Sequence, residues 1–261
     1  MRRLGIVLLG VLLLSGCAGS AFHSGDAERP VADQPATTEA RKIARSHVEL
    51  GVAYLGISRL GTAMEEARLA VLVDPAYAPA HQLLAEVYAR LDENPQALAS
   101  FEKALSLAPG DPDLNNTFGW FLCSTGREKE GLEWLAKSAA NPFNTTLSQP
   151  YTNSGLCQLR LKNDTAAAVS FARALAIDGN NATAAFNLAA IAYRKGDLVQ
   201  ARALITELIR SEKPTADAVW LGIRVEHKLG NKEAEASYIA QLRKGFESSQ
   251  QYLDYQAGRF E

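Results

Sequence analysis

Residues 78–111 read APAHQLLAEVYARLDENPQALASFEKALSLAPGD and carry the pattern from which the fold follows. Two stretches with apolar residues at helical spacing flank a polar run, and the second stretch ends at a proline. Because proline cannot continue a helix, this unit predicts two helices joined by a short turn. The unit before it matches at an offset of 34 residues in these pairs: Tyr54 and Tyr88, Ala63 and Ala97, Ala67 and Phe101, Ala70 and Ala104, Pro75 and Pro109. A fixed period of this length predicts a repeat architecture.

The repeated unit resembles the tetratricopeptide repeat (TPR). In that family a small residue at the eighth and twentieth positions lets helix A and helix B approach closely, and a proline near the thirty-second ends helix B. Carrying the frame along the chain predicts repeats at 44–77, 78–111, 112–145, 148–181, 182–214 and 215–248, with two extra residues after the third. We therefore expect an all-α TPR solenoid, a right-handed superhelix of about six helix pairs, over residues 43–261, with a C-terminal tail at 249–261.

Three other architectures fit the sequence less well. A coiled coil needs uninterrupted heptads, and here Gly and Pro break the pattern regularly. A β protein needs alternation with a period of two, which the sequence lacks. A disordered chain would not carry 47% hydrophobic residues.

The N-terminus predicts export. Arg2 and Arg3 precede an uncharged apolar run from Leu4 to Leu14, which is too short for a membrane span and typical of a secretory signal. The sequence Leu-Ser-Gly-Cys at 14–17 resembles the bacterial lipobox, which implies cleavage after residue 16 and a lipid on Cys17. Ala18 stands where an Asp would imply retention at the inner membrane, so the resemblance favours a lipid anchor in the outer membrane, facing the periplasm.

Residues 17–42 predict a flexible tether between this anchor and the folded part. They are rich in Gly, Ala, Ser, Pro and Asp, and they contain few bulky apolar side chains. Such a stretch cannot bury enough surface to offset the entropy lost on ordering.

Composition and motifs favour binding over catalysis. The formal charge is −2 with acids and bases interspersed, which argues against a nucleic-acid surface. The sequence lacks a nucleophile elbow, a phosphate-binding glycine loop and a zinc-protease motif. His47 and His81 occupy the fourth position of successive repeats, where we expect them to pack against helix B rather than bind a metal. We therefore expect a scaffold that is not an enzyme and holds no cofactor or metal.

Cys123 and Cys157 are the two cysteines besides Cys17. They lie near the ends of helix A in the third and fourth repeats, in a protein predicted to reach an oxidising compartment. Because compartment and repeat frame agree, we predict a disulfide between them. It would link two neighbouring repeats, and the chain-entropy model assigns it about 3 kcal/mol. The alternative is that both are small buried hydrophobic residues at the same level of the stack.

A narrower resemblance rests on the third and fourth repeats. The run Asn115–Cys123, NNTFGWFLC, is similar to a run of the PilF/PilW family, and NSGLC at 153–157 is similar to its partner run. The ending YLDYQ at 252–256 has the same character, whereas Thr117 stands where that family more often has Tyr. The resemblance implies a lipoprotein of type IV pilus biogenesis, a pilotin, that binds the secretin subunit and promotes its outer-membrane localisation and multimer assembly.

Other functions share these features. A TPR lipoprotein that serves as an adaptor for cell-wall enzymes or for outer-membrane barrel assembly would have the same fold and a different partner. A peptidoglycan-cleaving enzyme would need a catalytic set that the sequence lacks.

A partner-binding surface is predicted on the first repeat. The positions that line the concave face of the TPR family are here Arg45, Val48, Val52, Leu55 and Gly56. The three apolar residues among them share one helical stripe, and an apolar stripe on a wet surface predicts an interaction site. The alternative is that a helix from residues 30–43 folds back and covers it. Asn116 and Trp120 of the third repeat are a second candidate, although Trp120 could instead pack beneath the disulfide.

Overall fold

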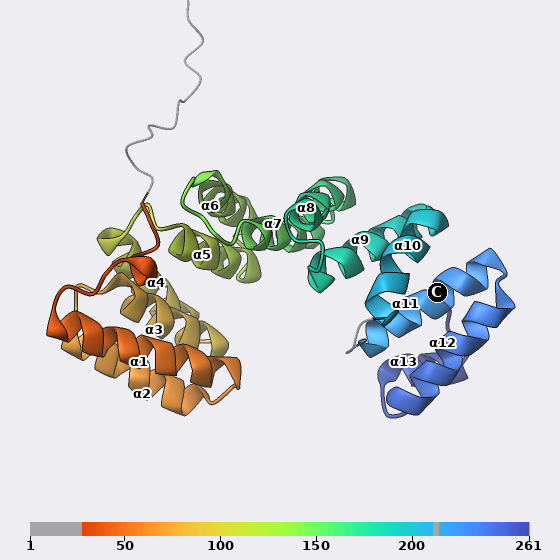
Figure 1. Ribbon diagram of the computed structural model, residues 1–261, viewed down its shortest axis with the longest axis horizontal. Helices are drawn as coiled ribbons and strands as arrows, with labels where there is room; N and C mark the ends of the chain where they lie inside the picture. The colour runs from red at the N-terminus through yellow and green to blue at the C-terminus, as the bar shows by residue number, and fades with distance from the viewer. Residues whose placement is uncertain (1–27, 211–213, 261) are drawn as a thin grey trace, which may run out of the picture.

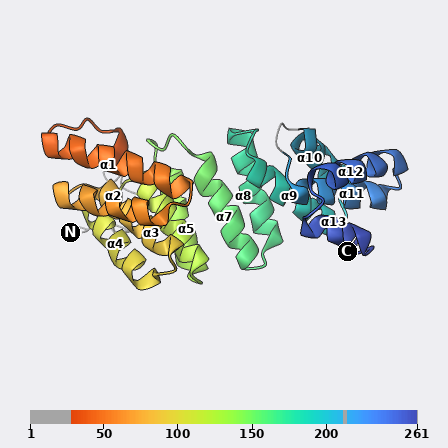
Figure 2. The ribbon, with the colours of Figure 1, turned by 90° about the horizontal axis from the view of Figure 1, so that it is seen from below.

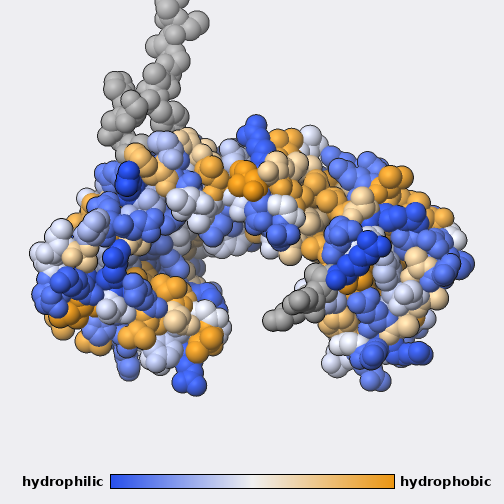
Figure 3. Space-filling model, in the orientation of Figure 1, coloured by the Kyte–Doolittle hydropathy of each residue, from blue (hydrophilic) through white to orange (hydrophobic). Residues whose placement is uncertain are grey.

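The computed structural model describes residues 28–210 and 214–260, which form an arch of paired helices (Figure 1). The arch is seen along its edge in Figure 2, and Figure 3 shows the open hollow between its two ends. The helices are α1 (Glu39–Gly56), α2 (Leu60–Val73), α3 (Ala78–Arg90), α4 (Asn94–Leu107), α5 (Pro112–Ser124), α6 (Glu128–Ala140), α7 (Ser148–Arg160), α8 (Asp164–Ile177), α9 (Ala182–Lys195), α10 (Leu198–Arg210), α11 (Ala216–Leu229), α12 (Lys232–Gly245) and α13 (Gln250–Gln256), preceded by one 3-10 turn, η1 (Val31–Asp33). The predicted all-α TPR solenoid is confirmed.

The helix pairs follow the frame of the repeat. Helices α3, α5, α7 and α9 begin at the first residues of the predicted second to fifth repeats. In four repeats the small residue predicted at the crossing of helices A and B is fully buried, which lets the backbones approach; these residues are Ala63, Ala97, Ala167 and Ala201. Ala234 of the sixth repeat is half-buried. Phe101 and Phe171 fill the space between successive pairs. In the third repeat Gly131 takes the place of the alanine, and its backbone lies directly against that of Gly119.

Each turn between helix A and helix B contains a residue in the left-handed region of the backbone. Three of the six positions have glycine, at Gly126, Gly196 and Gly230. The other three hold Ser58, Asp92 and Lys162, each with φ near 60°. Because an L-residue is disfavoured there, these three turns carry local strain that the packed helices hold in place.

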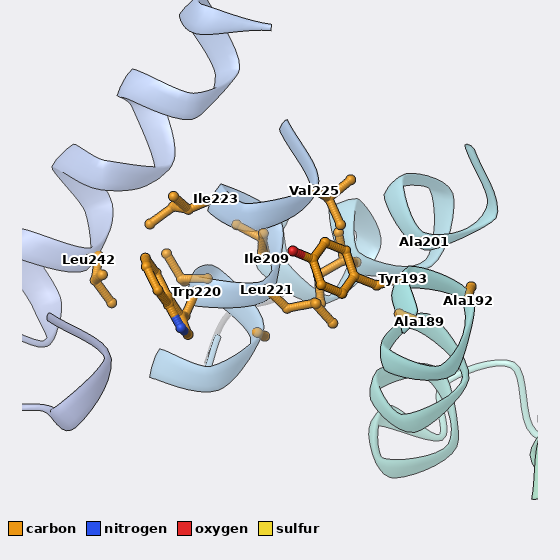
Figure 4. Packing of buried hydrophobic residues seen from close by; sticks show 13 residues of the cluster. Ala189, Ala192, Tyr193, Ala201, Ile209, Trp220, Leu221, Ile223, Val225 and Leu242 are labelled. Atoms are coloured by element: carbon orange, nitrogen blue, oxygen red, sulfur yellow. The ribbon is translucent and has the colours of Figure 1, made fainter. Parts of the chain in front are cut away.

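The last two repeats share one core, shown in Figure 4. Tyr193 of α9 lies beside Ile209 of α10, and Trp220 of α11 points towards Leu242 of α12. Helix α13 and Phe260 then pack on α11, where the Phe260 ring stacks on His227 with centroids 4.4 Å apart. The predicted C-terminal tail therefore includes a helix that closes the end of the stack.

The N-terminal end of the described chain differs from the predicted tether. Helix α1 begins at Glu39, five residues before the predicted first repeat, after an N-cap at Thr38 whose side chain accepts from the Arg41 N–H. Residues 28–36, here called the strap, pack against the solenoid through Pro30 and Val31. The prediction of a flexible tether is therefore wrong for the strap. Its few apolar side chains and its backbone groups contact residues of distant repeats, and these contacts order it.

The predicted signal peptide (1–16), the lipidation site Cys17 and the tether up to residue 27 lie outside the described residues. Within 28–210 and 214–260, none of the helices has the length and apolar character needed to span a membrane.

Candidate interaction surfaces

A disulfide joins the middle of the arch. Cys123 of α5 and Cys157 of α7 are bonded, with their Cα atoms 5.5 Å apart, and both are fully buried. Leu135 of α6 packs against them from the same repeat as Cys123. The bond closes a loop of 34 residues that includes all of α6 and the connector between the third and fourth repeats. It therefore fixes the two central helix A segments of the arch to each other.

The second predicted site, Asn116 and Trp120, lies beside this disulfide and is mostly enclosed. Asn116 is buried, and its Oδ1 accepts from Asn153 Nδ2 of α7 at 3.0 Å. Trp120 is half-buried and packs on the disulfide cluster, which is the alternative role considered for it. Both residues tie α5 to its neighbours, so the structure leaves little of either free for a partner.

The predicted stripe on the first repeat does not form one surface. Leu55 is only 7% exposed and packs with Ala63 and Met64 of α2 and with Leu83 and Val87 of α3. Its prediction as a surface residue is wrong. Leu55 and Val48 share a side of α1 by their spacing, and this side faces the next repeat. Gly51, which lies between them, is in close contact with Leu83 of α3.

The other members of that stripe differ in exposure. Val48 is half-buried and packs in two core clusters. Arg45 donates from Nη2 to the carbonyl oxygen of Gln34, 3.2 Å away, so it holds the strap. Val52 is 53% exposed and stays available to a partner, as does the exposed Gly56. The helix from 30–43 proposed as a cover is absent: residues 34–38 are not helical, and Val52 keeps its exposure.

The structure exposes a different apolar row on α1 and its C-cap residue, which we call the end-face stripe: Ile43, Leu50 and Ile57, exposed by 43%, 49% and 65%. Successive members are seven residues apart, so they lie on one side of the helix. Leu50 precedes Leu84 by one repeat length, and Leu84 of α3 packs in the cluster that joins α3 to α1 and α2 of the preceding repeat. Leu50 thus lies on the side of α1 that would receive helix B of a preceding repeat, whereas Leu91 and Leu161, the residues equivalent to Ile57, are exposed within the stack as well. The spacing of seven was visible in the sequence and could have identified the stripe.

Polar side chains connect α3 and α5. Gln82 Nε2 donates to Glu86 Oε1 at 3.0 Å and to Thr117 Oγ1 at 3.2 Å. Burial raises the pKa of Glu86, and the bond from Gln82 opposes this only in part. Burial, followed by the nearby Asp111 and Asp33, also raises the pKa of Asp113. Over the described part of the chain, no cationic group lowers either pKa.

The histidines make local contacts. His47 Nδ1 lies 2.6 Å from Glu66 Oε2 of α2, which is helix B of its own repeat. His81 is buried, and its Nε2 lies 2.9 Å from the carbonyl oxygen of Pro75. Among residues 28–210 and 214–260, no group of three or more His, Cys, Asp or Glu side chains is placed to hold a metal ion.

Comparison with known proteins bears on the whole chain. Residues 78–111 match the family model of the tetratricopeptide repeat. The chain is 28% identical over 255 residues to the type IV pilus assembly protein PilF of Pseudomonas aeruginosa (strain PAO1), covering 98% of each protein.

Two solved structures are similar as well. Pseudomonas aeruginosa PilF superposes with a TM-score of 0.75 at 26% identity, over 85% of this chain and 100% of that one. PilW, described as a widely conserved type IV pilus biogenesis factor, superposes with a TM-score of 0.73 at 28% identity, over 82% and 99%. These comparisons confirm the resemblance to the PilF/PilW family that the sequence motifs indicated.

Proposed function

We propose that this chain, a TPR protein that resembles the PilF/PilW family along nearly its whole length, acts in type IV pilus biogenesis. In this role it is a scaffold that binds the secretin subunit and promotes its outer-membrane localisation and multimer assembly. The observation that carries the proposal is the similarity to PilF over 98% of both chains, which leaves no large part of either protein unmatched. A binding role also agrees with the extended surface that stacked helix pairs provide.

The proposal includes a lipid anchor at Cys17 in the outer membrane, with the solenoid in the periplasm. The support is the resemblance of residues 14–17 to the lipobox at the end of an apolar run. Replacing Cys17 with Ser is expected to move the protein from the membrane fraction to the soluble fraction while circular dichroism stays unchanged. Persistent membrane association of Cys17→Ser would contradict the anchor.

The end-face stripe is the surface that we assign to the secretin subunit. End repeats of solenoids usually have a polar outer face, because no neighbour covers it. Here three large apolar side chains are exposed on α1 and its C-cap, whereas the other end of the stack is closed by α13, which packs on α11 and α12. An amphipathic helix of the partner could pack there as helix B of a preceding repeat would, with Val52 at the edge of the contact.

The test compares two exposed apolar surfaces of the same protein. Leu50→Gln with Ile57→Gln changes the end-face stripe, and Val169→Gln changes an equally exposed site on α8. Secretin multimers are measured in the outer membrane, and thermal unfolding is measured on the purified proteins. We expect the stripe variant to lose multimers and Val169→Gln to keep them, with stability changed by less than about 1 kcal/mol in both, as is usual for exposed sites.

Two outcomes would count against the assignment. Normal multimers with the stripe variant would move the binding site elsewhere on the arch. Capture of a cell-wall amidase or a barrel-assembly subunit in place of the secretin, from detergent-solubilised envelope, would replace the proposed partner with that of an adaptor lipoprotein.

A further inference from the structure

The strap (residues 28–36) runs across three repeats before α1 begins. At its start, Asn141 Nδ2, in the connector after α6, donates to the carbonyl oxygen of Glu28 at 3.0 Å. The N–H of Val31 then donates to Asp111 Oδ2 at 2.7 Å, while Oδ1 of the same carboxylate caps α5. Near its end, the carbonyl oxygen of Gln34 accepts from Arg45 of α1. The strap therefore connects the third repeat to the first along one edge of the solenoid.

Apolar contacts hold the strap as well. Pro30 is buried, and Val31 packs with Ala44, Tyr77 and Ala80, which belong to the first two repeats and their connector. The guanidinium of Arg29 lies over the ring of Phe143, 5.3 Å from its centroid. Hydrogen bonds, apolar contacts and a cation–π contact thus hold the strap at several points. The strap is therefore a packed part of the fold and differs from a flexible linker.

The strap moves the place where the chain enters the folded body. Without it, a tether would reach the solenoid at Glu39, at the start of the first helix. With it, residue 28 lies beside the connector between the third and fourth repeats. The strap, at the red start of the coloured chain, lies on the side of the arch opposite its opening (Figure 1). Eleven residues separate position 17 from position 28, and a chain of that length spans at most about 36–40 Å. Without the strap, the chain between position 17 and Glu39 would be twice as long and could span up to twice that distance.

We propose that the strap docks one edge of the solenoid, the connector 141–147 with Phe143 at its surface, onto the lipid surface that holds residue 17. The inference rests on the proposed lipid anchor. Phe143 is 39% exposed and lies beside the exposed Arg29, and an aromatic ring with a cationic neighbour suits the boundary between lipid headgroups and water. The arch then opens away from the membrane, and the hollow between its ends faces the periplasm.

Energy transfer to the membrane tests this orientation. The chain from residue 17 onward is coupled through the Cys17 thiol to a maleimide lipid in phosphatidylethanolamine–phosphatidylglycerol vesicles that also contain an acceptor lipid. A donor dye is attached, through an unnatural amino acid, either at Thr145 in the connector or at Glu233 at the start of α12. Both positions are exposed. We expect transfer from position 145 to exceed transfer from position 233 several-fold. Equal transfer from both would overturn the proposal.

A variant in the strap tests its role without changing any repeat. Pro30→Gly with Val31→Gly removes the two apolar side chains by which the strap packs on the solenoid and leaves the residues of the α-helices unchanged. With helicity unchanged, the difference in transfer between positions 145 and 233 is expected to disappear. If the difference persists, the strap does not set the orientation and the proposal fails. Phe143→Ser should lower the transfer from position 145, whereas Phe143→Trp should retain it; equal transfer from all three proteins would remove Phe143 from the lipid contact.

The vesicle result is independent of how the protein is anchored in the cell. Because the lipid is attached chemically, the experiment reports the orientation even if mass spectrometry of the native protein finds Cys17 unmodified. In that case the proposed lipid anchor would fail, and the docking of the tethered solenoid would be judged by the transfer alone.

Discussion

Gly131→Ala is expected to destabilise the protein, although the aligned position holds alanine in all five other repeats. A Cβ atom built on Gly131 would lie 2.6 Å from the carbonyl oxygen of Gly119, 2.9 Å from the N of Cys123 and 2.5 Å from its Sγ. Two of these atoms are backbone atoms, and the third is held by the bond to Cys157. None can rotate away, so helices α5 and α6 would have to separate.

The magnitude follows from two opposing effects. Alanine is favoured over glycine by about 1 kcal/mol inside a helix. Forcing extra volume into a packed contact costs about 1–3 kcal/mol, and the rigid neighbours place this site at the upper end of that range. The net loss is therefore about 2 kcal/mol, which corresponds to a decrease in melting temperature of about 4–8 °C for a domain of this size.

Thermal unfolding followed by circular dichroism at 222 nm measures this effect. Gly61→Ala in α2 is the control, because no atom lies within 4 Å of a Cβ built there. It is expected to raise the free energy of unfolding by up to about 1 kcal/mol. A Gly131→Ala protein as stable as the native one, or more stable, would refute the argument from packing against the disulfide.

Three further predictions concern single groups. Alkylation without reductant should leave Cys123 and Cys157 unmodified in intact-mass measurements, and two alkylated residues would mean that the disulfide is absent. Replacing both with Ser should lower the free energy of unfolding by about 3–4 kcal/mol, because the bond closes a loop of 34 residues. Burial raises the pKa of Glu86, so its contribution to stability is present below its unfolded pKa and is lost as the pH rises through its folded pKa. Glu86→Gln should therefore be more stable than the native protein at pH 7 and should lose this advantage at acidic pH. Urea unfolding at both pH values checks this, and a loss of stability at pH 7 would contradict it. Lys162→Gly, at φ 58°, should stabilise the protein by about 0.5–1 kcal/mol, and a decrease in melting temperature would show that the turn is not strained.

The repeat architecture could be predicted because its signals are local. Helical spacing, the proline after helix B and the small residues at the crossing recur at a fixed offset, so each repeat supports the assignment of the others. The two cysteines could be paired for the same reason, since the frame placed them at one level of neighbouring helix A segments. The resemblance to the PilF/PilW family also rested on short runs that needed no long-range information.

The binding surface could be predicted only in part, because α1 has apolar residues on several sides. Val48, Val52 and Leu55 form a helical stripe, and so do Ile43, Leu50 and Ile57. The spacing does not tell which of them faces the next repeat. That was decided by the packing of Gly51 and Leu55 against Leu83, which buries one side of the helix and exposes the other.

By itself, then, the sequence determined the all-α class, the repeat frame and the family that the chain resembles. Only the tertiary structure decided the course of the strap and the exposed side of α1. The physical reason is the range of the interactions. Residues 28–36 have the composition of a linker, and they are ordered by partners 80 and 113 residues away, Asp111 and Asn141, which no local pattern could connect to them.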